Sequence, residues 1–565
     1  MAQWLPRSVE SLRTYSRATF LADLIAGITV GLVALPLAMA FAISSGLTPQ
    51  QGIYCAVVTG FLISALGGSR TQIGGPTGAF VVIVFGIVEK YGVSGLYVVT
   101  FMAGVLILLL GLTGMGSAVR FIPRPVIVGF TNGIALLIAS TQIKDFFGIQ
   151  LAKVPGEFFE RMEALIGKAS TASLPAMALG GAALATIIVV MKLVPRVPGY
   201  IVALVGGTAA TVLLNLPVET IGSRFGGIPA GLPQFHMISL SVTQVVQLLQ
   251  PAVTVALLGA IESLMSAVVA DRMSDDQHNP NTELVAQGIA NMVSPMFGGL
   301  PATGAIARTA TSIRSGAKTP VAGMIHAATI LAVILVAAPL AKFVPLPVLA
   351  AILFVVAYNM GEWREIPEIL KLTATEIAVW FVTFALTVVA DLTLAVQVGM
   401  ISAALLYIKK VTQSTTVSEV TRNYVDDGWV HILQGKEIPP YLRVFRIHGP
   451  FLFGSTDKLK VITDQLDQLP RIVVLRLRNM NAIDGTGLKA LEDLADKLHT
   501  SGRQLLLCGA REQPARMLEQ SEVAQHIGRE NVVPHIKAAL ERAAELEQPR
   551  DPDEDSPAPA ATGFA

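Results

Sequence analysis

Cysteine, histidine and charged side chains are all scarce in this chain of 565 residues. Cys55 lies in an apolar segment and Cys508 in the polar last part of the chain, so the sequence supports neither a disulfide framework nor a thiolate metal site. The eight histidines show no catalytic or metal-ligand spacing, and we expect neither an enzyme nor a bound cofactor. The formal net charge is +1 without any basic tract, so we expect no nucleic-acid partner.

Apolar residues take the place of the missing charge. They make up 52% of the chain against 14% for charged residues, and the mean hydropathy of +0.60 predicts an integral protein of the lipid bilayer. Arg7, Arg13 and Arg17 precede the first apolar segment, which is too long for a signal peptide and has no small-residue cleavage pattern. We therefore expect a cytoplasmic N-terminal segment over residues 1–20.

Residues 21–410 are predicted to form an α-helical, polytopic transmembrane domain. Its fourteen apolar segments divide into two sets of seven, and an odd number per half forces the halves into opposite orientations. That arithmetic predicts an inverted repeat. The approximate bounds of the segments are 21–45, 51–67, 76–88, 94–115, 122–143, 174–194, 198–216, 248–270, 284–297, 303–313, 320–341, 346–360, 375–390 and 393–408.

Basic residues in the short links indicate the orientation. An excess of lysine and arginine marks cytoplasmic links. We therefore expect a protein of the inner (plasma) membrane whose chain continues into the cytoplasm after residue 410. The predicted cytoplasmic links carry Arg70, Arg120, Arg124, Lys192, Arg196, Arg272, Arg314, Lys318, Arg364, Lys371, Lys409 and Lys410, and the opposite short links carry Lys90, Arg224 and Lys342.

Two short, glycine-rich segments about two hundred residues apart repeat the tripeptide Thr-Gly-Ala. They open the third and tenth apolar segments, and charge returns soon after each, at Glu89 and at Arg308. About nine residues give about 13 Å of helix, against about 30 Å for the hydrocarbon core. Interrupted half-helices at matching positions are the best sequence indication of a transporter's binding site. The alternative is that glycine and proline only kink two ordinary spans.

The starts of these half-helices are the predicted substrate site. The first N–H groups of a helix have no intrahelical partner, and the helix dipole adds positive charge there. Two such starts that face each other would bind an anion without a cationic side chain. The predicted ligands are the backbone amides of Thr77, Gly78, Ala79, Phe80, Ala305, Ile306, Ala307 and Arg308.

Glu262 lies in the middle of the eighth segment, where an acid is costly unless it faces a cavity, a partner or a proton. We expect it to bind and release a coupling proton, and the alternative is structural pairing with a neighbour such as Arg308. Arg308 either helps to neutralise the anion or extends to the headgroups. Phe41 could line the cavity wall, although an aromatic residue in a membrane span usually serves packing.

After Lys410 the pattern changes to alternating strands and helices, which predicts a small α/β domain over residues 441–547. A linker over 411–440 precedes it, and the tail 548–565 is rich in proline, alanine and acidic residues and is expected to be disordered. The predicted strands are Leu442–Ile447, Ile472–Leu477 and Gln504–Cys508, and the predicted helices are Asp457–Leu466, Thr486–His499 and His535–Leu546.

Together these features resemble the SulP anion transporters, bacterial relatives of the animal sulfate and chloride–bicarbonate exchangers. The resemblance runs from about Asp23 to the end of the α/β domain. Its motifs are Asp23–Gly31 with Leu35 and Pro36, Ile73–Phe80, Ile261–Leu264 with Val268–Asp271, Asn281–Asn291 and Phe297–Arg308.

The resemblance implies a core domain that moves against a gate domain in an elevator-like way, with the anion between the third and tenth segments. It implies that the soluble domain is a STAS domain and that the protein forms a homodimer. In related anti-anti-sigma factors the segment matching Ile483–Leu488 carries a phosphorylatable serine, and the matching residue here is Thr486. The alternative is that Asp484 or Thr486 caps the following helix. The positions that match the family's anion pocket are Phe41, Thr77, Ala305, Ala307 and Arg308.

The resemblance is closest to proton-coupled members that take up C4-dicarboxylates, with sulfate next. Sodium-coupled bicarbonate members have aspartate where this chain has Glu262, and they lack the arginine that matches Arg308. We therefore expect proton-coupled symport of a small anion. Sodium-coupled bicarbonate uptake or anion exchange is the alternative, and an anion channel is the alternative of another class. A further possibility makes the STAS domain primary, as a docking module for a cytoplasmic partner.

Overall fold

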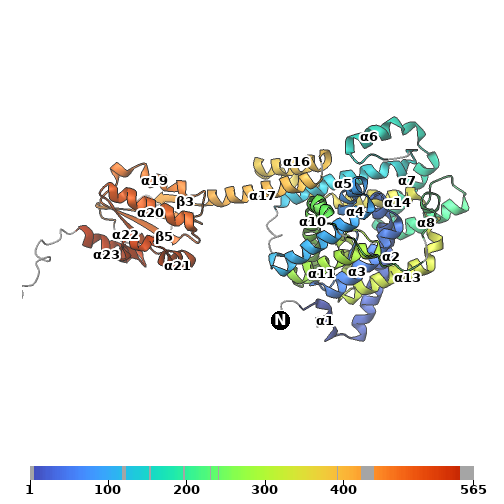
Figure 1. Ribbon diagram of the computed structural model, residues 1–565, viewed down its shortest axis with the longest axis horizontal. Coiled ribbons are helices and arrows are strands. Elements are labelled where there is room, and N and C mark those ends of the chain that lie inside the picture. The colour runs from blue at the N-terminus through green and yellow to red at the C-terminus, as the bar shows by residue number, and fades with distance from the viewer. Residues whose placement is uncertain are drawn as a thin grey trace, which may run out of the picture. The chain divides into compact units, whose positions relative to one another are not determined.

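The computed structural model describes residues 5–116, 123–151, 154–194, 197–228, 231–239, 241–390, 392–420 and 438–547. The chain forms two compact units, residues 1–403 and 404–565. The first is a bundle of helices and the second is a small α/β unit (Figure 1).

The helices of the first unit account for the fourteen predicted segments. Among the described residues, eight helices are long and apolar enough to cross a membrane, where a helix satisfies its own backbone hydrogen bonds. The third and fourth segments are continuous in α4, which is interrupted at Gly92 by a left-handed φ of 71°. The helices that correspond to the segments are α2 (Arg17–Ser44), α3 (Pro49–Leu66), α4 (Ala79–Leu112), α5 (Arg124–Phe147), α7 (Leu174–Leu193), α8 (Gly199–Leu213), α10 (Val242–Ser274), α11 (Pro280–Val293), α12 (Ile306–Arg314), α13 (Val321–Ala341), α14 (Leu346–Met360), α16 (Ala374–Val389) and α17 (Leu392–Ser414).

Capping side chains fix where several of these helices begin. Ser16 accepts a hydrogen bond from the backbone of Thr19 before α2, and Ser241 accepts one from Gln244 before α10. Short helices that the sequence patterns did not predict lie in the links. They are α1 (Arg7–Leu12), α6 (Phe158–Gly167), η3 (Ala169–Thr171), α9 (Ile221–Phe225), η4 (Ser294–Phe297), η5 (Trp363–Glu365) and α15 (Ile366–Ile369).

The membrane helices pack as two bundles. Helices α2, α3, α4, α10, α11, α12 and α13 contact one another and form what we call the core bundle. Helices α5, α7, α8, α14 and α16 form the gate bundle. Each bundle takes members from both halves of the chain, as an inverted repeat requires. Small residues allow close approach within the core bundle: a Cβ on Gly104 of α4 would lie 2.6 Å from the backbone nitrogen of Met292 in α11.

Two very short strands lie where α4 and α12 begin. β1 (Gly74–Gly75) pairs with β2 (Thr303–Gly304) in antiparallel register, with Gly74 opposite Gly304 and Gly75 opposite Thr303. Both strands are buried. The pairing brings together the two glycine-rich segments, one from each half of the chain. The sequence patterns did not predict it.

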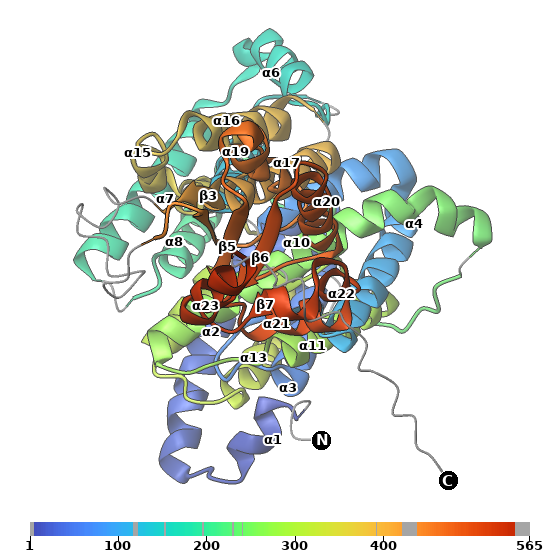
Figure 2. The same cartoon turned by 90° about the vertical axis from the view of Figure 1, so that its left-hand side faces the viewer.

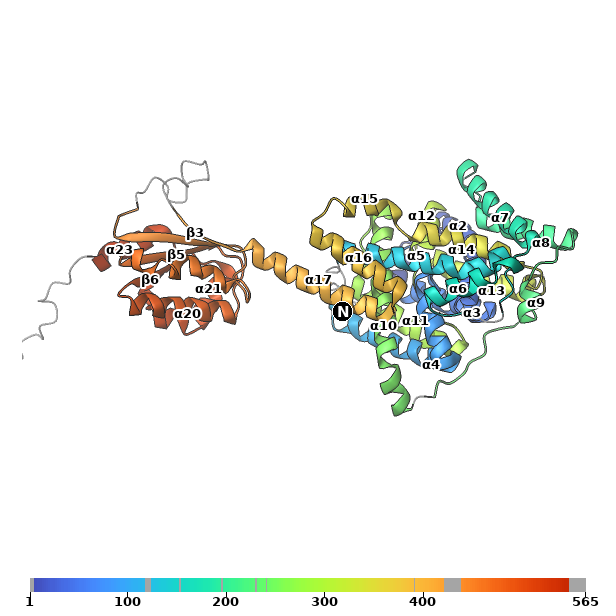
Figure 3. The same cartoon turned by 90° about the horizontal axis from the view of Figure 1, so that it is seen from above.

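The second unit is built around a five-stranded sheet of order β3-β4-β5-β6-β7, of which Figure 2 shows β5, β6 and β7 side by side. β3 (Thr416–Glu419) runs antiparallel to β4 (Leu442–His448), and β5 (Ile472–Asn479), β6 (Gln504–Cys508) and β7 (Val532–Val533) continue in parallel. Helices α20 (Gly485–Thr500) and α23 (Ile536–Glu547) cover opposite faces of the sheet (Figure 3). Cys508 belongs to the core under α23, and burial raises the pKa of its thiol to about 12.

The three predicted strands of this unit are confirmed as β4, β5 and β6, and two predicted helices are confirmed as α20 and α23. The predicted helix Asp457–Leu466 is confirmed in part. η6 (Thr456–Leu459) and α19 (Lys460–Thr463) follow each other directly, and turn residues 464–465 separate them from η7, which begins at Leu466. The predicted linker 411–440 begins with the end of α17 and with β3, and its residues 421–437 lie outside the described residues, as does the tail 548–565. The short turns and the unpredicted helices are η6 (Thr456–Leu459), α19 (Lys460–Thr463), η7 (Leu466–Gln468), α21 (Glu512–Gln520), α22 (Val523–Ile527) and η8 (Arg529–Asn531).

The start of α20 shows which of Asp484 and Thr486 caps the helix. One carboxylate oxygen of Asp484 accepts a hydrogen bond of 2.8 Å from the backbone of Gly487, and the other accepts one of 3.0 Å from Phe453. Asp484 is therefore the N-cap, and Thr486 is an exposed residue in the first turn.

Replacing Gly75 tests the close approach beneath the paired strands. Gly75 has a φ of 143°, and an added Cβ would lie 2.6 Å from the guanidinium Nη1 of Arg308. We expect Gly75→Ala to destabilise the protein by more than about 1 kcal/mol, seen as a lower apparent melting temperature in detergent. Gly86→Ala in α4 is the matched control, because an added Cβ there meets nothing within 4 Å. Equal melting temperatures for the two variants would contradict the close approach.

Removing the cap of α20 tests the assignment of Asp484. We expect Asp484→Ala to cost about 1 kcal/mol, because the first-turn amides lose their acceptor. Hydrogen exchange of the full-length protein should show faster exchange at Gly487 and Leu488. Thr486→Ala is the control and should leave exchange there unchanged. A larger effect from the threonine variant than from the aspartate variant would reverse the assignment.

Candidate functional site

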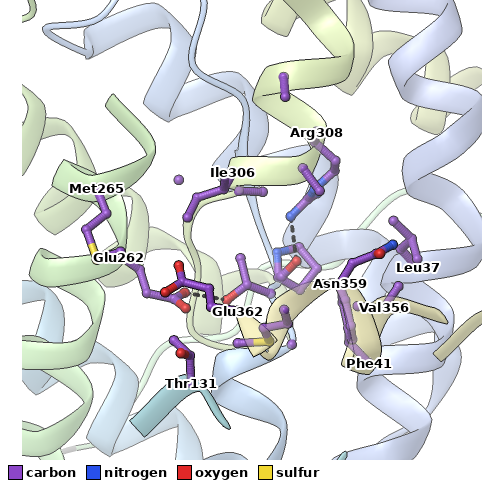
Figure 4. A pocket seen from close by; sticks show the side chains of 18 of the residues that line it. Leu37, Phe41, Thr131, Glu262, Met265, Ile306, Arg308, Val356, Asn359 and Glu362 are labelled. Carbon is purple, nitrogen blue, oxygen red and sulfur yellow. Dashed lines mark hydrogen bonds between the residues drawn. The ribbon is translucent and has the colours of Figure 1, made fainter. Parts of the chain in front are cut away.

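A cavity of about 490 Å³ lies between the core and gate bundles. Its core wall comes from α2, from the starts of α4 and α12 and from the middle of α10, and its gate wall comes from α5, α7, α8, α14 and α16. It extends from the half-helix starts at Thr77 and Ala305 to Arg314 at the end of α12 and Val126 near the start of α5. Figure 4 shows the side chains of 18 of the residues that line it.

Most of the residues that the sequence singled out come together here. Ala79 and Phe80 do not line the cavity; Ala79 is the first residue of α4, and both are buried in the core bundle. The Phe41 ring packs against the start of α4, since a Cβ on Gly78 would lie 3.4 Å from it. The predicted residues that line the cavity are Phe41, Thr77, Gly78, Glu262, Ala305, Ile306, Ala307 and Arg308.

Some of the predicted backbone amides donate hydrogen bonds within the protein, and others have no intrahelical partner. The N–H of Ala305 donates to the carbonyl of Ile73 at 2.8 Å, and the N–H of Phe80 donates to that of Thr77 at 3.3 Å. These two amides are engaged, which corrects the prediction that they bind substrate. Ile306 and Ala307 are the first residues of α12, so their N–H groups have no intrahelical partner, and both residues line the cavity.

Glu262 connects the two half-helix starts. Its Oε2 accepts one hydrogen bond of 2.9 Å from the hydroxyl of Thr77 and another of 3.1 Å from the hydroxyl of Thr303. These threonines open the two Thr-Gly-Ala repeats. Within the described part of the chain Glu262 has no cation within 4 Å, so the alternative of a structural ion pair with Arg308 is wrong.

Arg308 is buried, with 3% of its surface exposed, and therefore does not extend to the headgroups. Its Nη2 donates to the carbonyl of Pro76, just before the start of α4. Its Nη1 has no hydrogen-bond partner, and among the described residues no carboxylate lies within 4 Å of the guanidinium. A buried cation without a counter-charge is costly. An anion in the cavity would supply that charge.

Polar side chains on neighbouring helices hold the non-helical backbone in place. Asn291 of α11 both donates to the carbonyl of Ala302 and accepts from its N–H, at 2.9 and 2.8 Å. The hydroxyl of Thr309 accepts from the N–H of Ile73, and that of Ser263 accepts from the N–H of Gly304. Each bond satisfies a backbone group that lies outside a regular helix.

Sequence reasoning missed two kinds of residue at this site. Thr303 was passed over although it is the counterpart of Thr77 in the repeated tripeptide, and that repetition was the available signal. Asn359 and Glu362 line the cavity from the end of α14, and Arg314 lines it from the end of α12. These three lie at segment ends, where hydropathy alone does not distinguish a cavity from a headgroup region.

The arrangement suits binding of an anion beside a group that can hold a proton. Within the described residues no group of three or more histidine, cysteine, aspartate or glutamate side chains could hold a metal ion. The groups beside the half-helix starts are instead the buried guanidinium of Arg308, the free first amides of α12 and the carboxylate of Glu262.

Comparison with known proteins agrees with the fold. Residues 20–383 match the model of the sulfate permease family, and residues 435–543 match that of the STAS domain. The chain is 40% identical over 523 residues to "Putative sulfate transporter YvdB" of Bacillus subtilis, covering 92% of this chain and 97% of the relative. It is 30% identical over 560 residues to bicarbonate transporter BicA of Synechocystis, covering 95% and 96%.

Solved structures show the same architecture. The murine anion transporter Slc26a9 in its inward-facing state superposes with a TM-score of 0.85 at 18% identity, covering 96% of this chain and 94% of that one. The transmembrane domain of a cyanobacterial BicA superposes with a TM-score of 0.62 at 32% identity, covering 69% and 98%. The chain belongs to the sulfate permease family, as a helical membrane transporter with a STAS domain after its membrane part.

Proposed function

We propose that this chain is a secondary active carrier that moves a small anion together with a proton, and that the anion is a C4-dicarboxylate or sulfate. One observation carries the proposal. A single carboxylate oxygen, Oε2 of Glu262, accepts hydrogen bonds from hydroxyls at the starts of both half-helices. A change in the protonation of Glu262 therefore changes the hydrogen bonding at both half-helix starts.

The anion binds between the two half-helix starts. The free N–H groups of Ile306 and Ala307 and the positive ends of the helix dipoles attract it, and Arg308 provides the only guanidinium that is buried beside the half-helix starts in the described residues. Phe41 closes the site from α2 and keeps water away from one side. This arrangement needs no metal and no cofactor.

Coupling to the proton follows from electrostatic repulsion. An anion at the half-helix starts is repelled by ionised Glu262, and protonation of that carboxylate removes the repulsion. Binding of the proton then raises the affinity for the anion, and binding of the anion raises the affinity for the proton by the same factor. Such factors are typically about 5- to 150-fold. The hydroxyls of Thr77 and Thr303 are placed to donate hydrogen bonds to the ionised form.

Transport proceeds by movement of the core bundle against the gate bundle, an elevator-type alternating access. The groups proposed to bind the anion and the proton all belong to the core bundle, so they can move together while the gate stays. A midplane site closed by half-helices suits this mechanism better than an open channel. The excess of basic residues in one set of links supports a cytoplasmic N-terminus and a cytoplasmic STAS domain. The carrier is proposed to act in the plasma membrane as a homodimer.

Sodium-coupled bicarbonate uptake is the second candidate function. Two relatives named bicarbonate transporter BicA are 28% and 30% identical to this chain over nearly its whole length. The first candidate is favoured by the 40% identity to a relative named for sulfate, and by Glu262 and Arg308 at the positions where the sequence departs from the bicarbonate pattern.

The STAS domain is proposed to regulate transport or to bind a cytoplasmic partner. Thr486 is exposed in the first turn of α20, where a phosphate would be favoured by the helix dipole. Asp484 already caps this helix, so the hydroxyl of Thr486 is free of that structural task.

Glu262→Gln tests the coupling. The variant keeps the size and polarity of the side chain but cannot bind and release a proton. We therefore expect substrate binding to persist while stimulation of uptake by a proton gradient is lost. Glu368→Gln, which removes an exposed carboxylate that bonds Lys371, is the control and should retain full stimulation. A Glu262→Gln carrier that keeps full proton-driven uptake would refute the role of Glu262.

Proteoliposome uptake distinguishes the two candidate functions. Succinate, sulfate and bicarbonate are each offered under an imposed proton gradient and, separately, under a sodium gradient. We expect saturable uptake of succinate or sulfate driven by protons. Sodium-driven bicarbonate uptake would replace the first candidate with the second, and unitary currents in planar bilayers would show a channel.

A further inference from the structure

Glu362 brings a second carboxylate to the cavity, from the opposite wall. It follows α14 of the gate bundle, whereas Glu262 and Arg308 belong to the core bundle. Figure 4 shows all three side chains around the same cavity. The charged residues that line the cavity in the described part of the chain are Glu262, Arg308, Arg314 and Glu362. An anion site with an acid on its gate wall is unexpected, because that acid opposes binding.

The backbone at Glu362 is strained. Its φ of 44° and ψ of 35° lie in the left-handed region, which glutamate rarely adopts. Such a conformation persists only where the surroundings impose it, and it is most common at functional sites. A glycine at this position would remove the strain and also the carboxylate.

The surroundings of Glu362 impose this conformation through three contacts. The indole Nε1 of Trp363 donates to the carbonyl of Tyr358 at 2.9 Å, which closes the loop on the end of α14. The side chain of Asn132 in α5 donates to the carbonyl of Gly361. Arg124 forms an ion pair with Glu365 one turn further on. The loop is thus fixed to α5 on both sides of Glu362, and its carboxylate is held toward the cavity.

Nearby cations do not neutralise Glu362 by direct contact. Arg124 acts on it electrostatically, but that guanidinium is mostly exposed and its ion pair is with Glu365. Within the described residues no lysine or arginine nitrogen lies within 4 Å of the Glu362 carboxylate. An ionised Glu362 therefore adds a negative potential to the cavity, and the potential acts on any anion there.

We propose that Glu362 is a specificity-determining residue that weakens the binding of multiply charged anions in the conformation seen here. Repulsion between fixed charges scales with the charge of the ligand, so a dianion is opposed twice as strongly as a monoanion in free energy. In binding constants the effect on the dianion is the square of the effect on the monoanion. This inference rests on the proposed function.

Because Glu362 belongs to the gate, its repulsion of the anion differs between the two sides of the membrane. When the core bundle carries the anion away from this end of α14, Glu362 remains with the gate and its effect on the anion falls with distance. Glu362 therefore lowers affinity on one side of the membrane only. On that side it promotes release of a divalent substrate such as sulfate or succinate.

Matched ligand pairs of different charge test the inference. Dissociation constants are measured by titration calorimetry on the purified full-length protein, for sulfate against methyl sulfate and for succinate against succinamate. At roughly 10 Å and an effective dielectric constant between those of protein surface and water, one unit charge changes affinity by about threefold. We expect Glu362→Gln to tighten binding of the monoanion about threefold and of the dianion about tenfold.

Two variants keep the test specific. Glu362→Asp retains the charge and tolerates the left-handed backbone better than most residues, so the ratio of dianion to monoanion affinity should stay as in the unaltered protein. Glu368→Gln removes one carboxylate in α15, outside the cavity, and should also leave the ratio unchanged.

The possible outcomes distinguish a failure of the role of Glu362 from a failure of the proposed function. Equal changes for monoanion and dianion, or no change, in Glu362→Gln would overturn the role of Glu362 and leave the proposed function standing. Failure of the unaltered protein to bind either member of both pairs would overturn the proposed function, and this inference with it. A change of ratio in Glu368→Gln as large as in Glu362→Gln would show a general surface-charge effect and would also overturn the inference.

Discussion

The need to satisfy non-helical backbone inside the membrane governs the centre of this protein. A chain that breaks its helices at membrane depth exposes N–H and C=O groups that water cannot reach, and each unsatisfied group costs several kcal/mol. The pairing of β1 with β2 satisfies the first of these groups, and Asn291, Ser263 and Thr309 satisfy their neighbours. Among the described residues, the first amides of α12 have no intrahelical partner and belong to residues that line the cavity. The anion site is thus the part of the break that the protein leaves open.

The same break sets the electrostatics of the site. Gly75 has no side chain, and this lets the guanidinium of Arg308 lie directly against β1 and bond the carbonyl of Pro76. The paired strands also bring Thr77 and Thr303 to one oxygen of Glu262. One geometric device therefore positions a buried cation, two helix starts and a carboxylate within a single cavity.

The two bundles of the membrane part supply different walls of the cavity. The core bundle holds the groups proposed to bind anion and proton, and the gate bundle supplies the other wall, including Glu362. The STAS unit has its own sheet and its own apolar cores under α20 and α23, so its folding does not depend on that cavity. One continuous apolar core runs through both bundles, with contributions from α2, α4 and α10 and from α5, α7 and α14, and the cavity lies where the two bundles meet.

The sequence by itself determined the membrane class, the fourteen segments, the two interrupted helices and most of the STAS elements. These depend on local hydropathy, helix length and strand alternation, which are properties of neighbouring residues. It also identified Glu262 and Arg308 as unusual, because charge within an apolar segment is visible without a structure. Only the tertiary structure decided that Glu262 joins Thr77 to Thr303 and that the amide of Ala305 is engaged. Contacts between residues some two hundred positions apart depend on how the helices pack, and no local pattern records that packing.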